Sequence, residues 1–129
     1  KGTDTSRFRK GLNEMEIDKE LLKGHVDTII LSLLNEQDRY GYEIAKTIRH
    51  TSEEQFELKE ATLYLSLKRL EKKGCVTSYW SDEAAGGGRR KYYALTTEGK
   101  ALLAKKRLEW RFLKQLLPKF LEEGDGALE

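Results

Sequence analysis

Cysteine is nearly absent from this sequence of 129 residues, in which Cys75 is the single example. One cysteine excludes an intramolecular disulfide and any zinc site built from several thiolates. Because Cys75 stands at the start of a predicted strand, we expect a buried structural thiol. The histidines, His25 and His50, have no ligand cluster and no nucleophile beside them. We therefore expect no metal, no other cofactor and no enzyme activity.

Long apolar runs are also missing from the chain. No stretch approaches the roughly 18 residues of a membrane span, and no signal-peptide pattern opens the sequence. These absences favour a soluble, cytoplasmic protein without a membrane partner. Hydrophobic residues make up 38% of the chain and charged residues 36%. This composition predicts one domain with a small core and a highly charged surface, followed by a long terminal helix.

The overall charge says little about partners, but its distribution says more. The formal net charge is only +2, which is low for a strong DNA binder. Arg89, Arg90 and Lys91 nevertheless form an uninterrupted basic triplet directly after a run of glycines, and residues 68–73 carry more basic side chains. A nucleic-acid surface is one interpretation of this pattern, and an ordinary solvated surface is the other.

Apolar periodicity predicts two helices in the first half of the chain. The first extends over residues 19 to about 35, with Asp18 as its N-cap, and its apolar stripe is wide enough to be buried on more than one side. The second extends over Gly41–Thr51 and has the modest apolar content of a helix that crosses a DNA backbone. Tyr42 can donate its hydroxyl to a phosphate or simply pack at the helix start. Residues 56–58 then alternate in polarity, which suggests a very short strand that pairs with a later hairpin.

A third helix is predicted from about Lys59 to Lys73. Its apolar positions recur at i, i+4 and i+7 and are occupied by Leu63, Leu67 and Leu70, and Gly74 follows as a stop. The opposite face then carries Ala61, Leu65, Lys68 and Lys72. Lys59 and Thr62 at its start suit entry into a major groove, which is about 12 Å wide. The outward face lacks an Asn or Gln that reads bases, so direct readout should be modest.

The period then changes to that of strands. Residues Cys75–Ser81 and Arg89–Leu95 are rich in β-branched and aromatic residues, and a glycine-rich tip at 84–88 separates them. Glycines next to arginines let the loop approach DNA closely, while the guanidinium groups reach phosphates or a minor groove. A phosphate cradle for a nucleotide is excluded, because a strand and not a helix N-terminus follows the glycines.

The last helix begins at a cap formed by Thr96 or Thr97 and continues to about Leu117, where Pro118 should end or kink it. Its apolar stripe is too wide to be buried against one small core. A second subunit is the economical explanation. The main apolar positions are Leu103, Trp110, Leu113 and Leu117.

Together these elements predict an α+β, mainly helical fold. It is a winged helix-turn-helix, in which the third helix is the recognition helix and the hairpin is the wing, with a long C-terminal dimerisation helix. The predicted parts are a flexible N-terminal arm at 1–16, the winged helix-turn-helix DNA-binding domain at 17–95, the dimerisation helix at 96–121 and a tail at 122–129.

The same residues resemble those of the PadR-like transcriptional regulators, of the short type with a single C-terminal helix. The resemblance spans about Leu22 to Trp110. Its motifs, in the family's order, are Tyr40-Gly41-Tyr42-Glu43-Ile44, Thr62-Leu63-Tyr64, Leu67-Lys68-Arg69-Leu70-Glu71 with Gly74, Gly87-Gly88-Arg89-Arg90-Lys91-Tyr92-Tyr93, and Leu95-Thr96-Thr97-Glu98-Gly99. The sequence departs from the family at Ala61, where a glycine is usual, and at Leu65 and Gly88, where prolines are usual. The first two departures affect base preference, and the third should loosen the wing.

The resemblance implies a homodimeric repressor that binds double-stranded DNA at a pseudo-palindromic operator. It also implies that the C-terminal helix packs on the partner's first helix, and it makes Tyr64, Lys68 and the basic triplet the leading DNA contacts. The full set of candidate DNA contacts is Tyr42, Lys59, Thr62, Tyr64, Lys68, Arg89, Arg90 and Lys91.

Some members of this family bind aromatic or drug-like effectors at the dimer interface, with a tryptophan in the C-terminal helix. Trp110 can therefore stack on a flat effector or anchor the interface, and both roles stay open. The candidate residues for an effector site or a dimer interface are Leu103, Trp110, Leu113 and Leu117. A functional alternative of a different class is a protein-interaction module without sequence-specific DNA binding, because winged helices also serve that purpose.

Overall fold

The computed structural model describes residues 20–82 and 88–122. The predicted arm, nearly all of the glycine-rich tip and most of the tail lie outside these residues. The described elements are α2 (Glu20–Lys23), α3 (Val26–Glu36), β1 (Arg39–Tyr40), α4 (Gly41–Thr51), α5 (Glu60–Lys72), β2 (Val76–Ser81), β3 (Arg90–Leu95), α6 (Thr97–Leu116) and α7 (Pro118–Leu121). The predicted fold class, an α+β winged helix with a long C-terminal helix, is confirmed.

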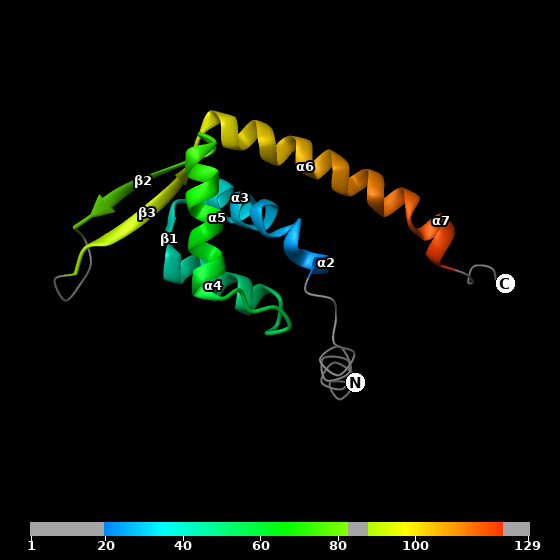
Figure 1. Ribbon diagram of the computed structural model, residues 1–129, viewed down its shortest axis with the longest axis horizontal. Helices are drawn as coiled ribbons and strands as arrows, with labels where there is room; N and C mark the ends of the chain where they lie inside the picture. Colours follow the sequence, from blue (N-terminus) through cyan, green and yellow to red (C-terminus); the bar gives the residue numbers. More distant parts are fainter. Residues whose placement is uncertain (1–19, 83–87, 123–129) are drawn as a thin grey trace.

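The elements form a small body from which two arms project. The strands make one antiparallel sheet in the order β1-β3-β2. Figure 1 shows α3 and α5 at the centre with α4 beside them, while the β2–β3 hairpin projects to one side. On the opposite side α6 leaves the body and carries α7 away from the hairpin. The wing and the C-terminal helix are therefore accessible on opposite sides of the body.

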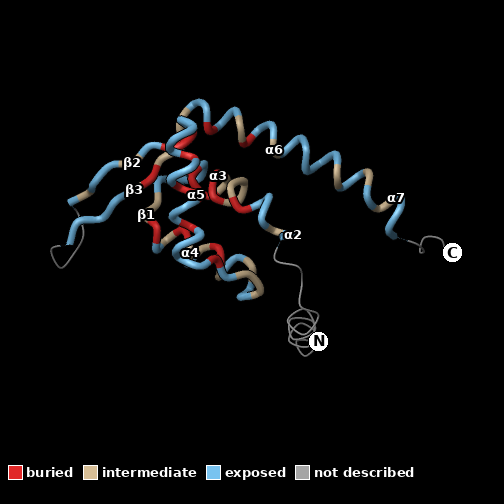
Figure 2. Tube along the Cα trace, in the orientation of Figure 1, coloured by how far each residue is buried: buried red, intermediate tan, exposed pale blue. Residues whose placement is uncertain are grey.

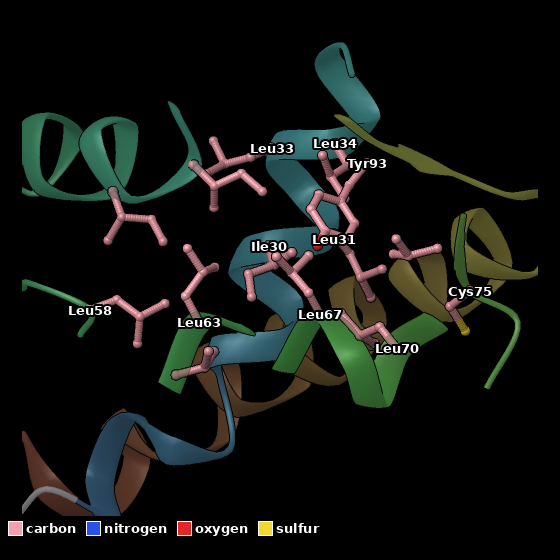
Figure 3. Packing of buried hydrophobic residues seen from close by; sticks show 14 of the residues in the cluster. Ile30, Leu31, Leu33, Leu34, Leu58, Leu63, Leu67, Leu70, Cys75 and Tyr93 are labelled. Carbon is pink, nitrogen blue, oxygen red and sulfur yellow. The ribbon is translucent and has the colours of Figure 1, made fainter. Parts of the chain in front are cut away.

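The core lies where α3, α4, α5 and the inner face of the sheet meet (Figure 3). Ile30 and Leu31 of α3 are completely buried, and Tyr93 closes the core from the sheet. Cys75 is buried at its edge, which confirms the predicted structural thiol. The inward positions of α5 are also confirmed, because Leu63, Leu67 and Leu70 are buried. Burial of these leucines drives α5 onto α3 through the hydrophobic effect.

The prediction of one continuous first helix is wrong. The chain forms α2 and α3 separately, with a turn at Gly24 and His25. The amide of His25 donates to the Leu22 carbonyl at 2.8 Å, a bond three residues back instead of four. Glycine is a weak helix former, and Gly24 has no neighbour that a side chain would contact. Nothing in the local packing therefore offsets the cost of glycine at this position.

The third strand of the sheet comes from a segment other than the predicted one. Residues 56–58 form no strand, because both backbone groups of Phe56 bond to the Ser52 hydroxyl at 3.1 Å. The alternation there has another cause, since Leu58 is buried in the core. Instead β1 pairs with β3, with Arg39 opposite Tyr93 and Tyr40 opposite Tyr92.

The side chain of Arg39 holds β1 against the end of α3. Its Nε donates to the Leu33 carbonyl at 3.1 Å, and its Nη2 pairs with Glu36 at 2.6 Å. Its Nη1 also reaches the hydroxyl of Thr47 on α4, at 3.4 Å. The guanidinium thus gives a second donor to a helix-end carbonyl whose other bond, from the Gln37 amide, is long at 3.5 Å. A strand of two residues exists here because of these tertiary bonds.

The end of α5 and the start of α6 are joined by a close backbone contact. Gly74 has a φ of +80°, and the Cys75 amide donates to the Leu70 carbonyl at 2.9 Å. This is the glycine-terminated helix end that the sequence predicts. Thr96 caps α6, because its hydroxyl accepts from the Gly99 amide at 3.0 Å and donates to the Gly74 carbonyl at 2.7 Å. One side chain thus links both helix ends.

The C-terminal helix also follows the prediction closely. α6 ends at Leu116, and the short helix α7 begins at Pro118, where the sequence predicts an end or a kink. Proline suits the first position of a helix because its missing amide hydrogen has no partner there.

Candidate nucleic-acid interface

The outer face of α5 is open to solvent along its length. Figure 2 shows buried and exposed segments alternating along this helix. The residues predicted on its outer face, Ala61, Leu65, Lys68 and Lys72, are exposed, as are the candidates Lys59 and Thr62 at its start. The structure therefore brings the candidates Lys59, Thr62 and Lys68 onto one accessible helix. A helix with this accessible face has the size to enter a major groove.

Tyr64 combines exposure with a structural contact. Its side chain is 41% exposed, but its ring end lies against Gly41 at the start of α4. A Cβ atom built on Gly41 would stand 2.0 Å from the Tyr64 hydroxyl oxygen. Only glycine leaves room for this contact, so Tyr64 fixes the spacing between α4 and α5. The sequence motif named both residues without indicating that they touch.

A cleft of about 250 Å³ separates α4 from α5. It is bordered by Tyr42, which is 61% exposed, and by Tyr64. The charged residues of its lining are Lys46, Arg49, Glu57, Lys59 and Glu60. Lys46 and Arg49 of α4 are additional basic residues at this cleft and are not among the predicted DNA contacts. Their spacing of three residues on one helix face was the available signal.

The basic triplet does not form one patch. Successive side chains of a strand point to opposite faces, so Arg90 lies on one face of β3 while Lys91 lies on the other. The Arg90 guanidinium carbon stands 4.6 Å from the centre of the Tyr40 ring. The ammonium of Lys91 stands 5.8 Å from the centre of the Tyr93 ring. The triplet therefore spreads its charge around the wing.

Arg89, just before β3, is engaged within the hairpin. Its Nε lies 3.2 Å from a carboxylate oxygen of Asp82, and its guanidinium carbon lies 5.1 Å from the centre of the Trp80 ring. Both partners are well exposed, so the ion pair is worth little in water. The guanidinium can leave Asp82 for a phosphate at small cost.

A row of tyrosines on the solvent face of the sheet was not recognised from the sequence. Tyr79, Tyr92 and Tyr40 are cross-strand neighbours. The Tyr79 and Tyr92 rings stack with centres 5.7 Å apart, and Tyr40 meets Tyr92 edge-on at 5.4 Å. Tyr42 extends the row to α4, with its ring 6.4 Å from that of Tyr40. The row connects the wing to the start of α4 and gives Arg90 an aromatic support.

Tyr93 is the residue on the inner face whose ionisation is altered. Burial raises the pKa of its phenol above the usual value near 10, and the nearby Tyr64 and Glu71 raise this pKa further. A buried phenolate would lose its hydration without gaining a cation that is equally buried. Tyr93 therefore stays neutral and serves the core.

A second, larger cavity lies between α3 and α6, on the side away from the wing. Its volume is about 490 Å³, and Leu103, Trp110 and Leu113 are among its lining residues. Leu117 does not line it. His25 does, and its ring meets that of Trp110 edge-on with centres 6.3 Å apart. The sequence gave no sign of this contact, because His25 precedes α3 whereas Trp110 lies far along the chain on α6.

The rest of α6 and α7 carries large apolar side chains in water. Figure 2 shows that most of α6 is exposed beyond its first turns. Trp110 is 52% exposed and Phe120 is 76% exposed. The other exposed large apolar residues here are Leu108, Phe112, Leu117 and Leu121. Helical geometry puts Leu108 and Phe112 on one side of α6 and Trp110 and Leu117 on another, and we call all six residues together the α6–α7 apolar surface. A surface of this kind usually marks an interaction site.

The described residues hold neither a metal-ligating cluster nor a membrane-spanning helix. Within residues 20–82 and 88–122, no three potential metal-ligating side chains gather. None of the helices in the described part of the chain combines the length and the apolar character needed to cross a membrane.

Comparisons with known proteins agree on one family. The model described as "Transcriptional regulator PadR-like family" matches residues 30–105, more than half of the chain. An uncharacterised protein from Lysinibacillus sphaericus is 43% identical over 106 residues, which cover 82% of this chain and 96% of that protein. A transcriptional regulator from Clostridium thermocellum has a similar structure, with a TM-score of 0.75 and 45% identity, covering 82% of this chain and 99% of its own. A PadR family transcription regulator from Clostridium difficile has a TM-score of 0.68 and 52% identity, covering 75% of this chain and 98% of its own.

Proposed function

The chain belongs to the PadR-like family of transcriptional regulators, and from this membership we propose that it acts as a homodimeric repressor on a pseudo-palindromic operator. The family consists of DNA-binding regulators and not of enzymes. The observation that carries the proposal is the combination of two surfaces on one small body. An exposed helix and a basic wing suit DNA, and the α6–α7 apolar surface suits a second copy.

The argument for a dimer rests on the α6–α7 apolar surface. Six large apolar side chains are exposed along α6 and α7, which project from the body, and water contact with so much apolar area is unfavourable. In a two-fold dimer the same surface is buried on both subunits. The partner's α2 and α3 offer a matching surface, because Leu21 is 60% exposed beside the α3–α6 cavity. A dimer built this way presents two copies of α5 about 34 Å apart, in successive major grooves.

The proposed DNA contacts divide into two groups. Lys59, just before α5, and Thr62 and Lys68 of α5 face the major groove. Tyr42 at the start of α4 and Tyr64 on the side of α5 flank them. Arg89, Arg90 and Lys91 of the wing bind phosphates or enter a minor groove. Because the wing residues project from different faces, each neutralises its own phosphate. Phosphate contacts of this kind give affinity without sequence preference.

Binding to DNA from the region upstream of the protein's own gene is the direct test. In fluorescence anisotropy at several salt concentrations, Arg89→Ala/Arg90→Ala should weaken binding to any duplex and lower the salt slope by about 0.9 for each phosphate that the wing no longer neutralises. The matched control, Lys100→Ala/Lys105→Ala, removes the same charge from exposed positions on α6 and should leave the slope nearly unchanged. Equal slopes for the two double variants would remove the wing from the mechanism. If the parent protein binds no duplex but binds another protein stably, the alternative function, a protein-interaction module, would be favoured instead.

The α3–α6 cavity is the proposed effector site. It is largely apolar, and Trp110 provides a flat surface on which a planar aromatic compound can stack. A planar aromatic compound should quench tryptophan fluorescence, and this quenching should disappear in a Trp110→Ala protein that still dimerises. Quenching that survives with Trp80 as the remaining indole would assign Trp110 to the dimer interface alone.

A further inference from the structure

One ion pair connects the recognition helix to the first turn of α3. The Arg69 Nη2 lies 2.8 Å from one carboxylate oxygen of Asp27, and its Nε lies 3.3 Å from the other. The same Nη2 donates to the Ser66 hydroxyl at 3.1 Å. Two nitrogens of the guanidinium therefore meet the two oxygens of the carboxylate, and this bidentate geometry fixes the orientation of the pair. The partners lie 42 positions apart in the sequence, so nothing but the tertiary fold brings them together.

The burial of the pair is uneven. The Asp27 side chain is 22% exposed, whereas that of Arg69 is 50% exposed, and Ser66 is buried. A carboxylate that has lost most of its water needs its cation, because an unpaired buried charge is costly. Arg69 is thus committed to Asp27 more strongly than a surface arginine that is free to choose a phosphate.

Arg69 also occupies a distinct side of α5. The outer face carries Lys68 and Lys72, and the side towards the wing carries Tyr64 and Glu71. Glu71 accepts a hydrogen bond from the Ser78 hydroxyl of β2 at 2.8 Å, and Tyr64 rests on Gly41 of α4. Arg69 holds the opposite side, against α3. Polar and close contacts on both sides limit how far α5 can turn about its own axis.

We propose that Asp27 and Arg69 form a positioning pair, which sets the angle at which α5 presents its outer face to the operator. Arg69 acts through Asp27 and does not itself contact DNA. This inference rests on the proposed operator binding. It assigns a role in sequence discrimination to two residues outside the candidate DNA contacts. Discrimination is sensitive to this angle because base contacts need close geometry, whereas phosphate contacts tolerate a turn of the helix.

The experiment compares Asp27→Asn, Arg69→Gln and the double variant. The affinity of each protein is measured for the operator and for an unrelated duplex of equal length, well below the melting temperature and at several salt concentrations. We expect each single variant to lower the ratio of operator affinity to unrelated-duplex affinity by roughly threefold to tenfold. The double variant should lose no more than either single variant, because the pair acts as a unit. The salt slope should stay close to that of the parent.

Other outcomes distinguish the alternatives. A phosphate contact by Arg69 predicts that Arg69→Gln lowers the salt slope by about 0.9 while Asp27→Asn has no effect, and this result would overturn the proposal. A merely structural role predicts a lower melting temperature with an unchanged affinity ratio, which would also overturn it. If the parent protein prefers no duplex at all, operator binding itself fails, and that failure is visible before any variant is made.

Discussion

A substitution at Gly99 would test how closely the start of α6 packs against the backbone that follows α5. A Cβ atom at this position would lie 2.2 Å from the Cys75 carbonyl oxygen and 2.5 Å from a methyl carbon of Leu95. The leucine can turn aside, but the carbonyl belongs to the backbone and accepts a hydrogen bond from the Thr96 amide at 3.1 Å. The substitution Gly99→Ala therefore has to push the start of α6 away from the sheet.

The size of the effect follows from opposing contributions. At an unobstructed helical position, replacing glycine with alanine stabilises a protein by up to about 1 kcal/mol. Overpacking costs about 1–3 kcal/mol, and displacement of Thr96 removes a helix cap worth about 1 kcal/mol. We expect a net loss of about 1–3 kcal/mol in the free energy of unfolding, because the gain in propensity offsets roughly the loss of the cap.

Urea denaturation followed by circular dichroism measures this free energy. All proteins are compared at one concentration, because the unfolding of a dimer depends on it. Gly24→Ala is the matched control: the position is exposed, and an added Cβ would meet no atom within 4 Å. It should be neutral or stabilise the protein by up to about 1 kcal/mol. A Gly99→Ala protein as stable as the parent would refute the inferred contact between α6 and the Cys75 carbonyl.

Three further predictions concern other parts of the molecule. Gly41→Ala should displace the Tyr64 ring and weaken DNA binding, and an equal loss in a Tyr64→Ala background would contradict this. Because burial raises the pKa of Tyr93 in the folded protein, the stability that its neutral form contributes is present below about pH 10 and lost as pH rises through the folded pKa. Tyr93→Phe should flatten the alkaline decline in unfolding free energy, and an identical decline in both proteins would contradict that assignment. Phe112→Glu should convert the dimer to a monomer in sizing experiments while the neighbouring Lys114→Glu does not, and a dimer in both cases would remove Phe112 from the interface.

The features that local sequence predicts well are those whose cause is local. The three inward leucines of α5 recur with the helical period, and Gly74 adopts the positive φ that ends the helix. Thr96 caps α6 within its own turn. Each of these depends on residues a few positions apart, so a pattern in the sequence is enough to reveal it.

The strand prediction failed because alternating polarity does not show what satisfies the backbone or which core buries an apolar side chain. Residues 56–58 alternate in polarity as a strand does, but Leu58 is buried by the core and Ser52 satisfies the backbone of Phe56. The true strand, β1, has no recognisable pattern and exists because Arg39 and β3 hold it.

The candidate site shows the same division. Exposed residues on the outer face of α5 could be named from helical geometry alone. The contact between Tyr64 and Gly41, the tyrosine row and the His25–Trp110 pair could not. These contacts join separate elements, and their geometry is set by how those elements pack.

By itself the sequence determined the order and type of the main helices, the hairpin and the existence of apolar surface in excess of one small core. Periodicity and composition carry that information because they reflect local backbone preference and the total apolar area. Only the tertiary structure decided which rings the basic triplet contacts, because Tyr40 reaches Arg90 through the pairing of β1 with β3. The three basic residues are adjacent in the sequence, but successive side chains of β3 point to opposite faces. Arg90 therefore lies over Tyr40 and Lys91 over Tyr93. The tertiary structure also decided that Arg69 pairs with Asp27 on the side of α5 that faces α3, because only the fold brings this partly buried carboxylate within reach.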